Sequence, residues 1–339
     1  MNLVLDFVDR HREQIASHEP RAAEALAYVV LTPRFRASRH VVFLLVHRSS
    51  GAPLLVAKVA RLGDSGAWSE REAENLRAAH AARRGGLASI PRVLACEEHR
   101  NHTILLETAL AGSALDPAAM RAQPRRRVRA VGSWLIDFQK TQRAARGAEG
   151  PIDARLDEAF AILARVGGGE LERDLERTRA LAAPLRGSVA SVFEHGDLSH
   201  PNLLELEAGG IGVLDWETAD PQGLPASDLF FFLCYAAFAC KRATELDAQQ
   251  RAFHATFFEE TDWVREACTR YAEALEIEHE ALRPLFALSW LRGASSFARR
   301  LDVGGRGDAA APDAARWIRE NRHTALWRHT LQHWDQLRL

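Results

Sequence analysis

The stretch from His195 to Asn202 is HGDLSHPN, and an apolar run that ends in VLDWE follows at 213–217. Three oxygen-bearing side chains stand out: Asp197, Asn202 five residues later, and Asp215 at the end of the apolar run. Phosphoryl transfer uses an Asp that meets the acceptor hydroxyl, together with an Asn and a second Asp that hold a metal ion on the nucleotide. The two stretches therefore predict a phosphoryl-transfer loop.

The composition is that of an ordinary globular chain. Its 339 residues are 47% hydrophobic and 26% charged, which suits one large or two moderate domains with a sizeable core. A formal net charge of -1 gives no reason to expect nucleic acid or a membrane as a partner. The N-terminus has no long apolar signal segment, and the longest apolar run, 229–240, is too short to span a bilayer. The four cysteines form no Cys-x-x-Cys pair, so we expect free thiols in a reducing cytoplasm.

The hydrophobic pattern changes character near residues 108–112. Before that point it predicts a small antiparallel sheet that carries one helix, and after it a mostly helical region. The elements expected before it are a helix over 2–30, strands over 40–46 and 54–59, a helix over 69–84, and strands over 92–97 and 102–107. Those expected after it are helices over 124–142, 154–166 and 170–181, a strand–loop–strand segment over 193–217, and helices from 228 to the end.

With its motifs in this order, the chain resembles the aminoglycoside phosphotransferase and choline kinase superfamily, whose fold is similar to that of protein kinases. The resemblance covers about residues 41–232. It rests on the HGD motif with Asn202, on VLDWE, on LPASDL (224–229), and on weaker N-terminal matches such as AK (57–58) and RE (71–72). It implies an α+β, two-lobed fold. The small antiparallel-sheet N-lobe spans residues 1–107, a hinge 108–112, and the large, mostly helical C-lobe 113–339.

The resemblance also implies roles for the loop residues. Asp197 is the expected catalytic base, and Asn202 and Asp215 are the expected ligands of Mg²⁺, which prefers such hard oxygen atoms. His195 is expected to brace the loop rather than carry a proton.

Two further acidic residues belong to the same pattern. Asp228 is expected to brace the loop from the start of a helix, where a carboxylate is also a good N-cap. Glu217 is equally compatible with assistance at the metal and with a surface role.

The nucleotide site is expected in the N-terminal lobe. Lys58 lies in an apolar strand, where an unpaired ammonium is costly, so we expect it to contact phosphates and a helix Glu. Glu72 fits the family register best, with Glu70 and Glu74 as rivals. The hinge is expected to meet the nucleobase of ATP or GTP through main-chain groups, and residues Glu107 and Ala109 are assigned to this site.

Two departures from the family pattern stand out. The loop Thr32–Arg39 contains no glycine, so either Arg36, Ser38 or Arg39 reaches the phosphates or the loop is a solvated basic turn. In the catalytic loop, Ser199-His200-Pro201 stands where His-Pro-Gly is common, which leaves its backbone path open.

The predicted function is that of a small-molecule kinase, which transfers the γ-phosphoryl of ATP or GTP to a hydroxyl of an aminoglycoside or other antibiotic. The segment between Asp215 and Asp228 is too short for a protein-docking loop. One alternative is a kinase of a sugar, nucleoside or amino alcohol in a biosynthetic pathway. Another is a pseudokinase-like nucleotide-binding module, which the missing glycine loop motivates.

Acceptor residues are expected in the helical half, although acidic helix faces are usually solvated and Trp is usually core. The candidates are the acidic Glu259, Glu260 and Asp262 and the aromatic Trp263, Trp290, Trp317, Trp327 and Trp334.

Overall fold

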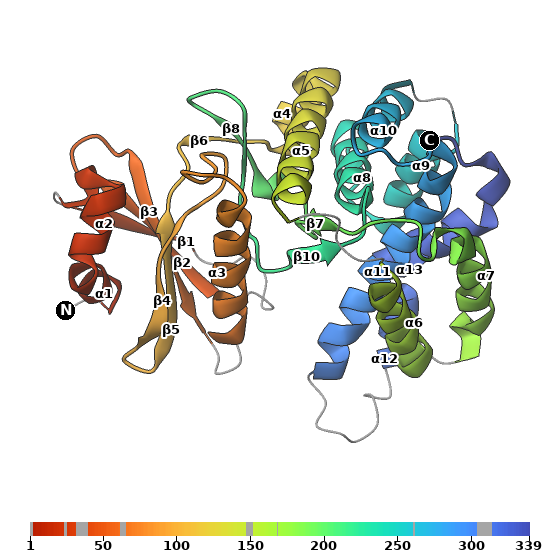
Figure 1. Ribbon diagram of the computed structural model, residues 1–339, viewed down its shortest axis with the longest axis horizontal. Coiled ribbons are helices and arrows are strands. Elements are labelled where there is room, and N and C mark those ends of the chain that lie inside the picture. The colour runs from red at the N-terminus through yellow and green to blue at the C-terminus, as the bar shows by residue number, and fades with distance from the viewer. Residues whose placement is uncertain are drawn as a thin grey trace. The chain divides into compact units, whose positions relative to one another are not determined.

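The computed structural model describes residues 3–23, 26–31, 40–61, 66–146, 152–167, 169–259, 262–303 and 314–339. The chain divides into two compact units (Figure 1). The sheet unit consists of Met1–Leu115 and Pro201–Ala219, and the helical unit of Asp116–His200 and Asp220–Leu339. No helix in the described ranges has the length and apolar character that a bilayer crossing requires. The four cysteines are free thiols.

The sheet unit is built on a five-stranded antiparallel sheet in the order β1-β2-β3-β5-β4. Figure 1 shows helices α1 and α2 on one side of this sheet and α3 on the other. Its strands are β1 (Leu26–Leu31), β2 (His40–His47), β3 (Pro53–Ala60), β4 (Val93–His99) and β5 (His102–Thr108). Its helices are α1 (Leu3–Arg10), α2 (Arg12–His18) and α3 (Gly66–Ala81), with a 3-10 turn over Pro20–Ala23.

The alternation of strand β3 separates the core from the site. Leu55, Ala57 and Val59 join Phe7 of α1 in one buried apolar cluster. Because successive side chains of a strand point to opposite faces, Lys58 lies on the other face, where α3 packs. The alternation of side chains along β3 thus places Lys58 on the face opposite the apolar core.

The expected helix over residues 2–30 is wrong in its last part. After α1, α2 and the 3-10 turn, Leu26–Leu31 forms the edge strand β1, which pairs antiparallel with β2. The residues LAYVVL favour a strand through their aromatic and β-branched side chains, and four of them, Tyr28 to Leu31, are exposed. The helical periodicity of the preceding residues, which form α1 and α2, led the expected helix to continue over this strand.

A second, three-stranded sheet in the order β6-β8-β9 brings the later motif residues into the sheet unit. Its strands are β6 (Gly112–Ala114), β8 (Leu203–Leu206) and β9 (Ile211–Val213). The expected strand–loop–strand segment over 193–217 in fact contains three strands, β7 (Val192–Glu194), β8 and β9. Gly112 lies so close to β8 that a Cβ atom there would be 2.6 Å from the carbonyl oxygen of Glu205. Only glycine therefore fits at this crossing without a shift of the backbone.

The helical unit has helices throughout and one short antiparallel strand pair, β7 (Val192–Glu194) with β10 (Asp220–Gly223). Its core is aromatic, with Phe230, Phe253, Phe286 and Trp290 almost fully buried. The helices are α4 (Pro117–Ala122), α5 (Pro124–Arg146), α6 (Asp153–Gly167), α7 (Glu172–Ala182), α8 (Ser227–Lys241), α9 (Leu246–Phe257), α10 (Asp262–Ala274), α11 (Leu282–Val303), α12 (Ala314–Glu320) and α13 (Arg322–Gln332). The α+β fold class, with an antiparallel-sheet unit and a larger, mostly helical unit, is confirmed.

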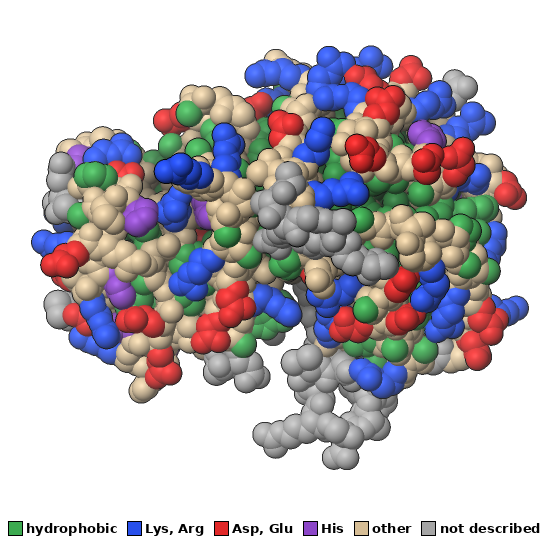
Figure 2. Space-filling view, in the orientation of Figure 1, with side chains coloured by type: hydrophobic (Ala, Val, Ile, Leu, Met, Phe, Trp, Pro, Cys, Tyr) green, Lys and Arg blue, Asp and Glu red, His purple; other side chains and the backbone are tan. Residues whose placement is uncertain are grey.

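Acidic and basic side chains are interspersed on the face drawn in Figure 2, in keeping with the net charge of -1.

Candidate active site

Lys58 is the centre of a buried charged cluster in the sheet unit. Its Nζ lies 2.5 Å from Oε1 of Glu72 on α3 and 3.4 Å from Oε1 of Glu107 on β5. Glu70 and Glu74, the two rivals for this position, are exposed on α3. A strand lysine paired with a helix glutamate is the arrangement that protein kinases use to hold nucleotide phosphates. The structure therefore brings together Lys58 and Glu72, as the sequence predicted.

The cluster is electrostatically unbalanced, because three carboxylates surround one ammonium. Burial by itself would lower the pKa of Lys58, but Glu107, Glu72 and Asp215 together raise it well above its usual range. Burial raises the pKa of Glu107 to about 7, although Lys58 opposes this shift. Lys58 is thus held as a cation, and the site carries an excess of negative charge that a cation would offset.

Helix α3 also fixes the backbone that carries Asp215. Oε1 of Glu72 accepts a hydrogen bond from the main-chain N–H of Trp216, at 3.0 Å. Asn75 donates through Nδ2 to the carbonyl oxygens of Trp216 (2.9 Å) and Ala219 (3.1 Å). These contacts support the left-handed conformation of Asp215, whose φ is +64° and which a non-glycine residue adopts only where the surroundings hold it.

Asn202 is placed beside Asp215 by strand pairing. Leu203 of β8 pairs with Val213 of β9, and just beyond this pair the N–H of Leu214 donates to the carbonyl oxygen of Asn202, at 2.9 Å. Asn202 and Asp215 therefore lie at the same end of the β8–β9 strand pair. Both line one cavity of about 520 Å³ in the sheet unit, whose wall also includes Lys58 and Glu107. The apolar part of the wall consists of Leu31, Val42, Leu44, Val56, Ala109, Leu110, Leu204 and Leu214, and His40 and Glu217 complete it.

Residues of the segment that the sequence predicted as a hinge line this cavity, with one difference from expectation. The main-chain N–H of Ala109 donates to the carbonyl oxygen of Leu54, at 2.9 Å, so it is engaged within the sheet. The next residue, Leu110, lines the cavity beside Ala109. Glu107 points its carboxylate at Lys58, and within the described ranges its buried Oε2 has no hydrogen-bond partner. Glu107 thus contributes a side chain to the site as well as a main-chain segment.

The loop that carries Asp197 belongs to the helical unit and is braced by one carboxylate. Asp228 accepts hydrogen bonds from the main-chain N–H groups of His195 (2.7 Å) and Gly196 (2.9 Å). The bracing role expected for Asp228 is confirmed. The N-cap role is wrong, because Ala226 occupies the N-cap of α8 and the Asp228 carboxylate is directed at the loop instead. Burial raises the pKa of Asp228 to about 7, and the nearby Glu194 adds to the shift.

Within the loop, His195 and Ser199 hold Asp197 from both sides. The N–H of Asp197 donates to Nδ1 of the buried His195 at 3.3 Å, in agreement with a structural role for this histidine. The hydroxyl of Ser199 donates to Oδ1 of Asp197 at 3.2 Å. Gly196, which lies between His195 and Asp197, has a φ of +82° and provides the left-handed turn at this point. Ser199 is a positioning residue that motif reasoning missed, and its signal was the departure from the usual His-Pro-Gly.

A second layer of buried polar groups supports the strand before the loop. Arg292 of α11 contacts Oε1 of Glu194 at 2.6 Å, and the N–H of Leu224 donates to the other oxygen, at 2.9 Å. Tyr271 of α10 accepts from the N–H of Ala226, at 2.9 Å, and donates to Gln139. Arg292 and Tyr271 lie on helices far along the chain from this strand, so no local sequence pattern indicated these contacts.

A model of the phosphotransferase enzyme family matches residues 37–267, which is more than half of the chain. The chain belongs to the phosphotransferase enzyme family. Membership confirms the resemblance inferred from the HGD and VLDWE motifs, and with it the kinase-like, two-lobed fold class. The protein is thus a phosphotransferase with an alcohol group of a small molecule as acceptor.

Several solved structures are similar to this phosphotransferase. One is a thermostable mutant of the aminoglycoside phosphotransferase APH(4)-Ia with AMP-PNP and hygromycin B (17% identity, 94% of this chain and 97% of that chain, TM-score 0.47). Another is a choline/ethanolamine kinase family protein from Mesorhizobium loti (16% identity, 95% and 99%, TM-score 0.47). A third is APH(3'')-Id from Streptomyces rimosus with ADP and streptomycin (17% identity, 82% and 98%, TM-score 0.43). No curated protein sequence matches the chain.

The remaining predicted residues of the phosphotransferase do not form a single acceptor site in the part that the structure describes. Trp290 and Trp327 are buried in the core, whereas Trp317 is 45% exposed. Glu259 lines a groove of α9, and Trp263 lines a different cavity with arginines of α5. The loop Thr32–Arg39 and Glu260 lie outside the described residues.

Proposed function

We propose that this phosphotransferase moves the γ-phosphoryl group of ATP or GTP to a hydroxyl of an aminoglycoside or other small antibiotic. The observation that carries the proposal is the cavity of the sheet unit, where Lys58, Asn202 and Asp215 line one wall. A cation for the phosphates and two hard oxygen ligands for a metal are the parts that phosphoryl transfer requires.

The nucleotide is proposed to lie in the same cavity. Lys58, charged and held by Glu72, would contact the α- and β-phosphates. Val42, Val56 and Leu204 supply apolar side chains for a planar base. The base edge is assigned to main-chain groups of residues 107–111, and since the N–H of Ala109 is engaged with Leu54, Leu110 offers the nearest alternative donor.

The residues present fit Mg²⁺. Asn202 and Asp215 each offer an oxygen ligand, and Mg²⁺ commonly takes only one or two protein ligands while phosphates and water fill the rest. The excess of negative charge around Lys58 is a second point of fit, because it favours a divalent cation. When bound, the ion would neutralise charge on the β- and γ-phosphates. Glu217, which lines the same cavity, is a candidate assistant at this ion.

Asp197 is proposed as the base that orients the acceptor hydroxyl. In a loose phosphoryl-transfer transition state, the position of that hydroxyl matters more than strong basicity. The hydrogen bonds from Ser199 and to His195 support this role, since they fix the carboxylate and its backbone.

The test is an acceptor panel read by mass spectrometry. Aminoglycosides, other hydroxylated antibiotics, sugars, nucleosides and choline-like alcohols would each be incubated with enzyme, Mg²⁺ and either ATP or GTP. We expect a phosphorylated aminoglycoside or other antibiotic, and we expect Asp197→Asn to lower kcat by about 10²–10⁴-fold. Asp137→Asn, an exposed carboxylate on α5, is the matched control and should keep the wild-type rate.

Two results would overturn separate parts of the proposal. Phosphorylation confined to sugars, nucleosides or amino alcohols would move the enzyme to a biosynthetic role. Nucleotide binding without any product, together with equal basal hydrolysis by wild type and Asp197→Asn, would favour a nucleotide-binding module without turnover. Asp215→Asn addresses the metal: retention of the full Mg-dependent thermal shift with nucleotide would remove Asp215 from the metal site.

A further inference from the structure

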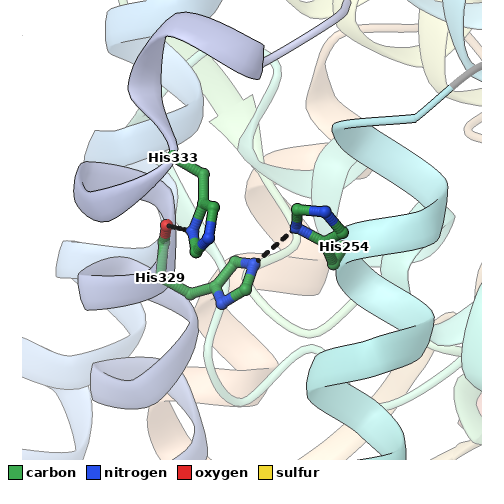
Figure 3. Close-up of side chains that lie close together, drawn as sticks. All are labelled: His254, His329 and His333. Carbon is green, nitrogen blue, oxygen red and sulfur yellow. Dashed lines mark hydrogen bonds between the residues drawn. The ribbon is translucent and has the colours of Figure 1, made fainter.

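A cluster of three histidines lies in the helical unit, on elements that the phosphotransfer proposal does not use. His254 comes from α9, and His329 and His333 come from the end of α13 (Figure 3). One ring nitrogen of each lies within 4.8 Å of the others. Within the described ranges these three form the one group of at least three His, Cys, Asp or Glu side chains close enough to share a metal ion.

We propose that His254, His329 and His333 form a binding site for a divalent transition metal of the zinc class, separate from the magnesium site. Three imidazoles with an open fourth position are a common ligand set for Zn²⁺. His329 lies in the last turn of α13, and His333 is the C-cap residue of that helix, with the two rings stacked at a centroid distance of 4.2 Å. The third ligand comes from a facing helix, as in bundle metal sites.

The distances are close to those of a metal site. Nδ1 of His254 and Nε2 of His329 are 3.0 Å apart and share a hydrogen bond. Two ligands of a tetrahedral ion with Zn–N bonds of about 2.0–2.1 Å are about 3.3–3.4 Å apart. For this pair an opening of a few tenths of an ångström suffices, and the ligating nitrogen of His333 lies within 4.8 Å of both. One of the two rings must change tautomer, because the proton between these nitrogens gives way to the metal while each ring stays neutral.

His333 carries the kind of outer contact that orients metal ligands. Its Nδ1 is 3.0 Å from the carbonyl oxygen of His329, to which it donates. This contact leaves Nε2 with the lone pair. A ligating histidine usually donates its other N–H to a carbonyl or carboxylate in this way, which fixes ring orientation and tautomer. The contact is present without any ion, so the site is partly preorganised.

Aromatic side chains and an open groove surround the cluster. Phe253 and Phe258 pack against the cluster, with ring centroids 5.8 Å and 5.4 Å from that of His329. The cluster faces a groove of about 810 Å³, from which a water molecule can fill the fourth position. The charged residues of that groove are Lys241, Asp247, Arg251 and Glu259, two of each sign.

A bound metal ion would cross-link α9 to the end of α13. The two segments are already joined where the N–H of Arg338 donates to the carbonyl oxygen of Phe257. A metal that binds only the folded chain raises its stability in proportion to the logarithm of the free metal concentration. Zinc should therefore raise Tm without any nucleotide present.

The test is a titration of chelator-treated, full-length protein with ZnCl₂, followed by calorimetry and thermal unfolding. We expect one equivalent of Zn²⁺ bound at the cluster and a rise in Tm. Co²⁺ should give the intense visible bands of a tetrahedral site. Loss of an outer-shell partner typically weakens a metal site 10–100-fold, so His329→Gln or His254→Gln should weaken zinc binding at least about 100-fold. His279→Gln, an exposed histidine outside the cluster, should bind as wild type does.

Two outcomes of the zinc titration would contradict the proposed histidine site. Zinc binding of equal strength in wild type and both cluster variants, or no rise in Tm, would overturn the site. Binding that is lost in Asp215→Asn but kept in His329→Gln would assign the ion to the phosphotransfer cavity instead. Circular dichroism and Tm of the metal-free variants report folding separately, and His254→Gln serves if His329→Gln is unstable. None of these outcomes bears on whether the protein phosphorylates an acceptor.

Discussion

Two buried carboxylates, Glu107 in the sheet unit and Asp228 in the helical unit, have the same altered acidity but different partners. Burial raises the pKa of each to about 7. Glu107 faces the ammonium of Lys58, whereas Asp228 accepts hydrogen bonds from the main-chain N–H groups of His195 and Gly196. The first carboxylate is one of several around a single ammonium, and the second fixes the path of a loop. The two sites should therefore respond differently when the charge is removed.

The hydrogen-bonding carboxylate should show the larger effect. Asp228→Ala leaves two main-chain N–H groups of the loop without their acceptors, at about 1–3 kcal/mol for each group that stays buried. We expect a loss of roughly 2–5 kcal/mol in the free energy of unfolding, measured in urea. We also expect a fall in kcat with little change in KM for the nucleotide, because the loop carries Asp197.

Asp228→Asn is the control for this prediction. The amide keeps one oxygen acceptor and has nearly the same shape, so part of the stability and rate should return. If Asp228→Ala unfolds at the wild-type urea concentration and keeps the wild-type kcat, the carboxylate does not brace the loop, and the comparison between the two sites fails.

The closest partner of Lys58 should show an intermediate effect. Glu72→Gln keeps an acceptor for the N–H of Trp216 but removes the negative charge 2.5 Å from Lys58. Breaking a buried ion pair costs about 3–5 kcal/mol when no other partner remains. Since Glu107 stays near Lys58, we expect a smaller loss of about 1–3 kcal/mol and a raised KM for the nucleotide.

Glu74→Gln is the matched variant, because Glu74 is exposed on the same helix. It should change the free energy of unfolding by less than about 0.5 kcal/mol. Equal effects of Glu72→Gln and Glu74→Gln would show that the Lys58 pair contributes no more than a surface charge.

The smallest effect, and one of opposite sign, is expected for Glu107→Gln. A carboxylate with a raised pKa binds its proton more tightly in the folded state. The stability that it contributes is therefore present below about pH 4.5 and is lost as the pH rises to about 7. The glutamine variant lacks this loss, and Lys58 keeps Glu72. We expect equal stability near pH 4.5 and a variant more stable by on the order of 1–2 kcal/mol at pH 8.

The measurement is the difference between the wild-type and variant unfolding free energies from pH 4.5 to 8, which cancels titration elsewhere in the chain. A difference that is flat with pH, or a variant that is less stable at pH 8, would show that Glu107 is ionised at no cost. The two buried carboxylates would then differ in acidity as well as in partner.

Prediction from sequence succeeded where a motif fixes both residue type and spacing. The pairing of Lys58 with Glu72 followed from a lysine that an apolar strand could not leave unpaired and from the register of one helix. The HGD and VLDWE motifs, in which residue types and spacing are both fixed over a few positions, indicated the family that the family model confirms. Asp228 was identified as the brace but not as a direct acceptor of loop N–H groups, because the direction of its side chain depends on the packing of α8.

The sequence by itself determined the fold class and the family, and it indicated the side chains that we propose for phosphoryl transfer. These follow from periodicity and short-range spacing, which act within a few residues of the chain. The tertiary structure alone decided the hydrogen bonds of Asn75 to the backbone beside Asp215 and the meeting of His254 with His329 and His333. Each of these joins positions that are separated by an intervening segment, often more than seventy residues long. Only the packing of whole elements brings such positions within bonding distance.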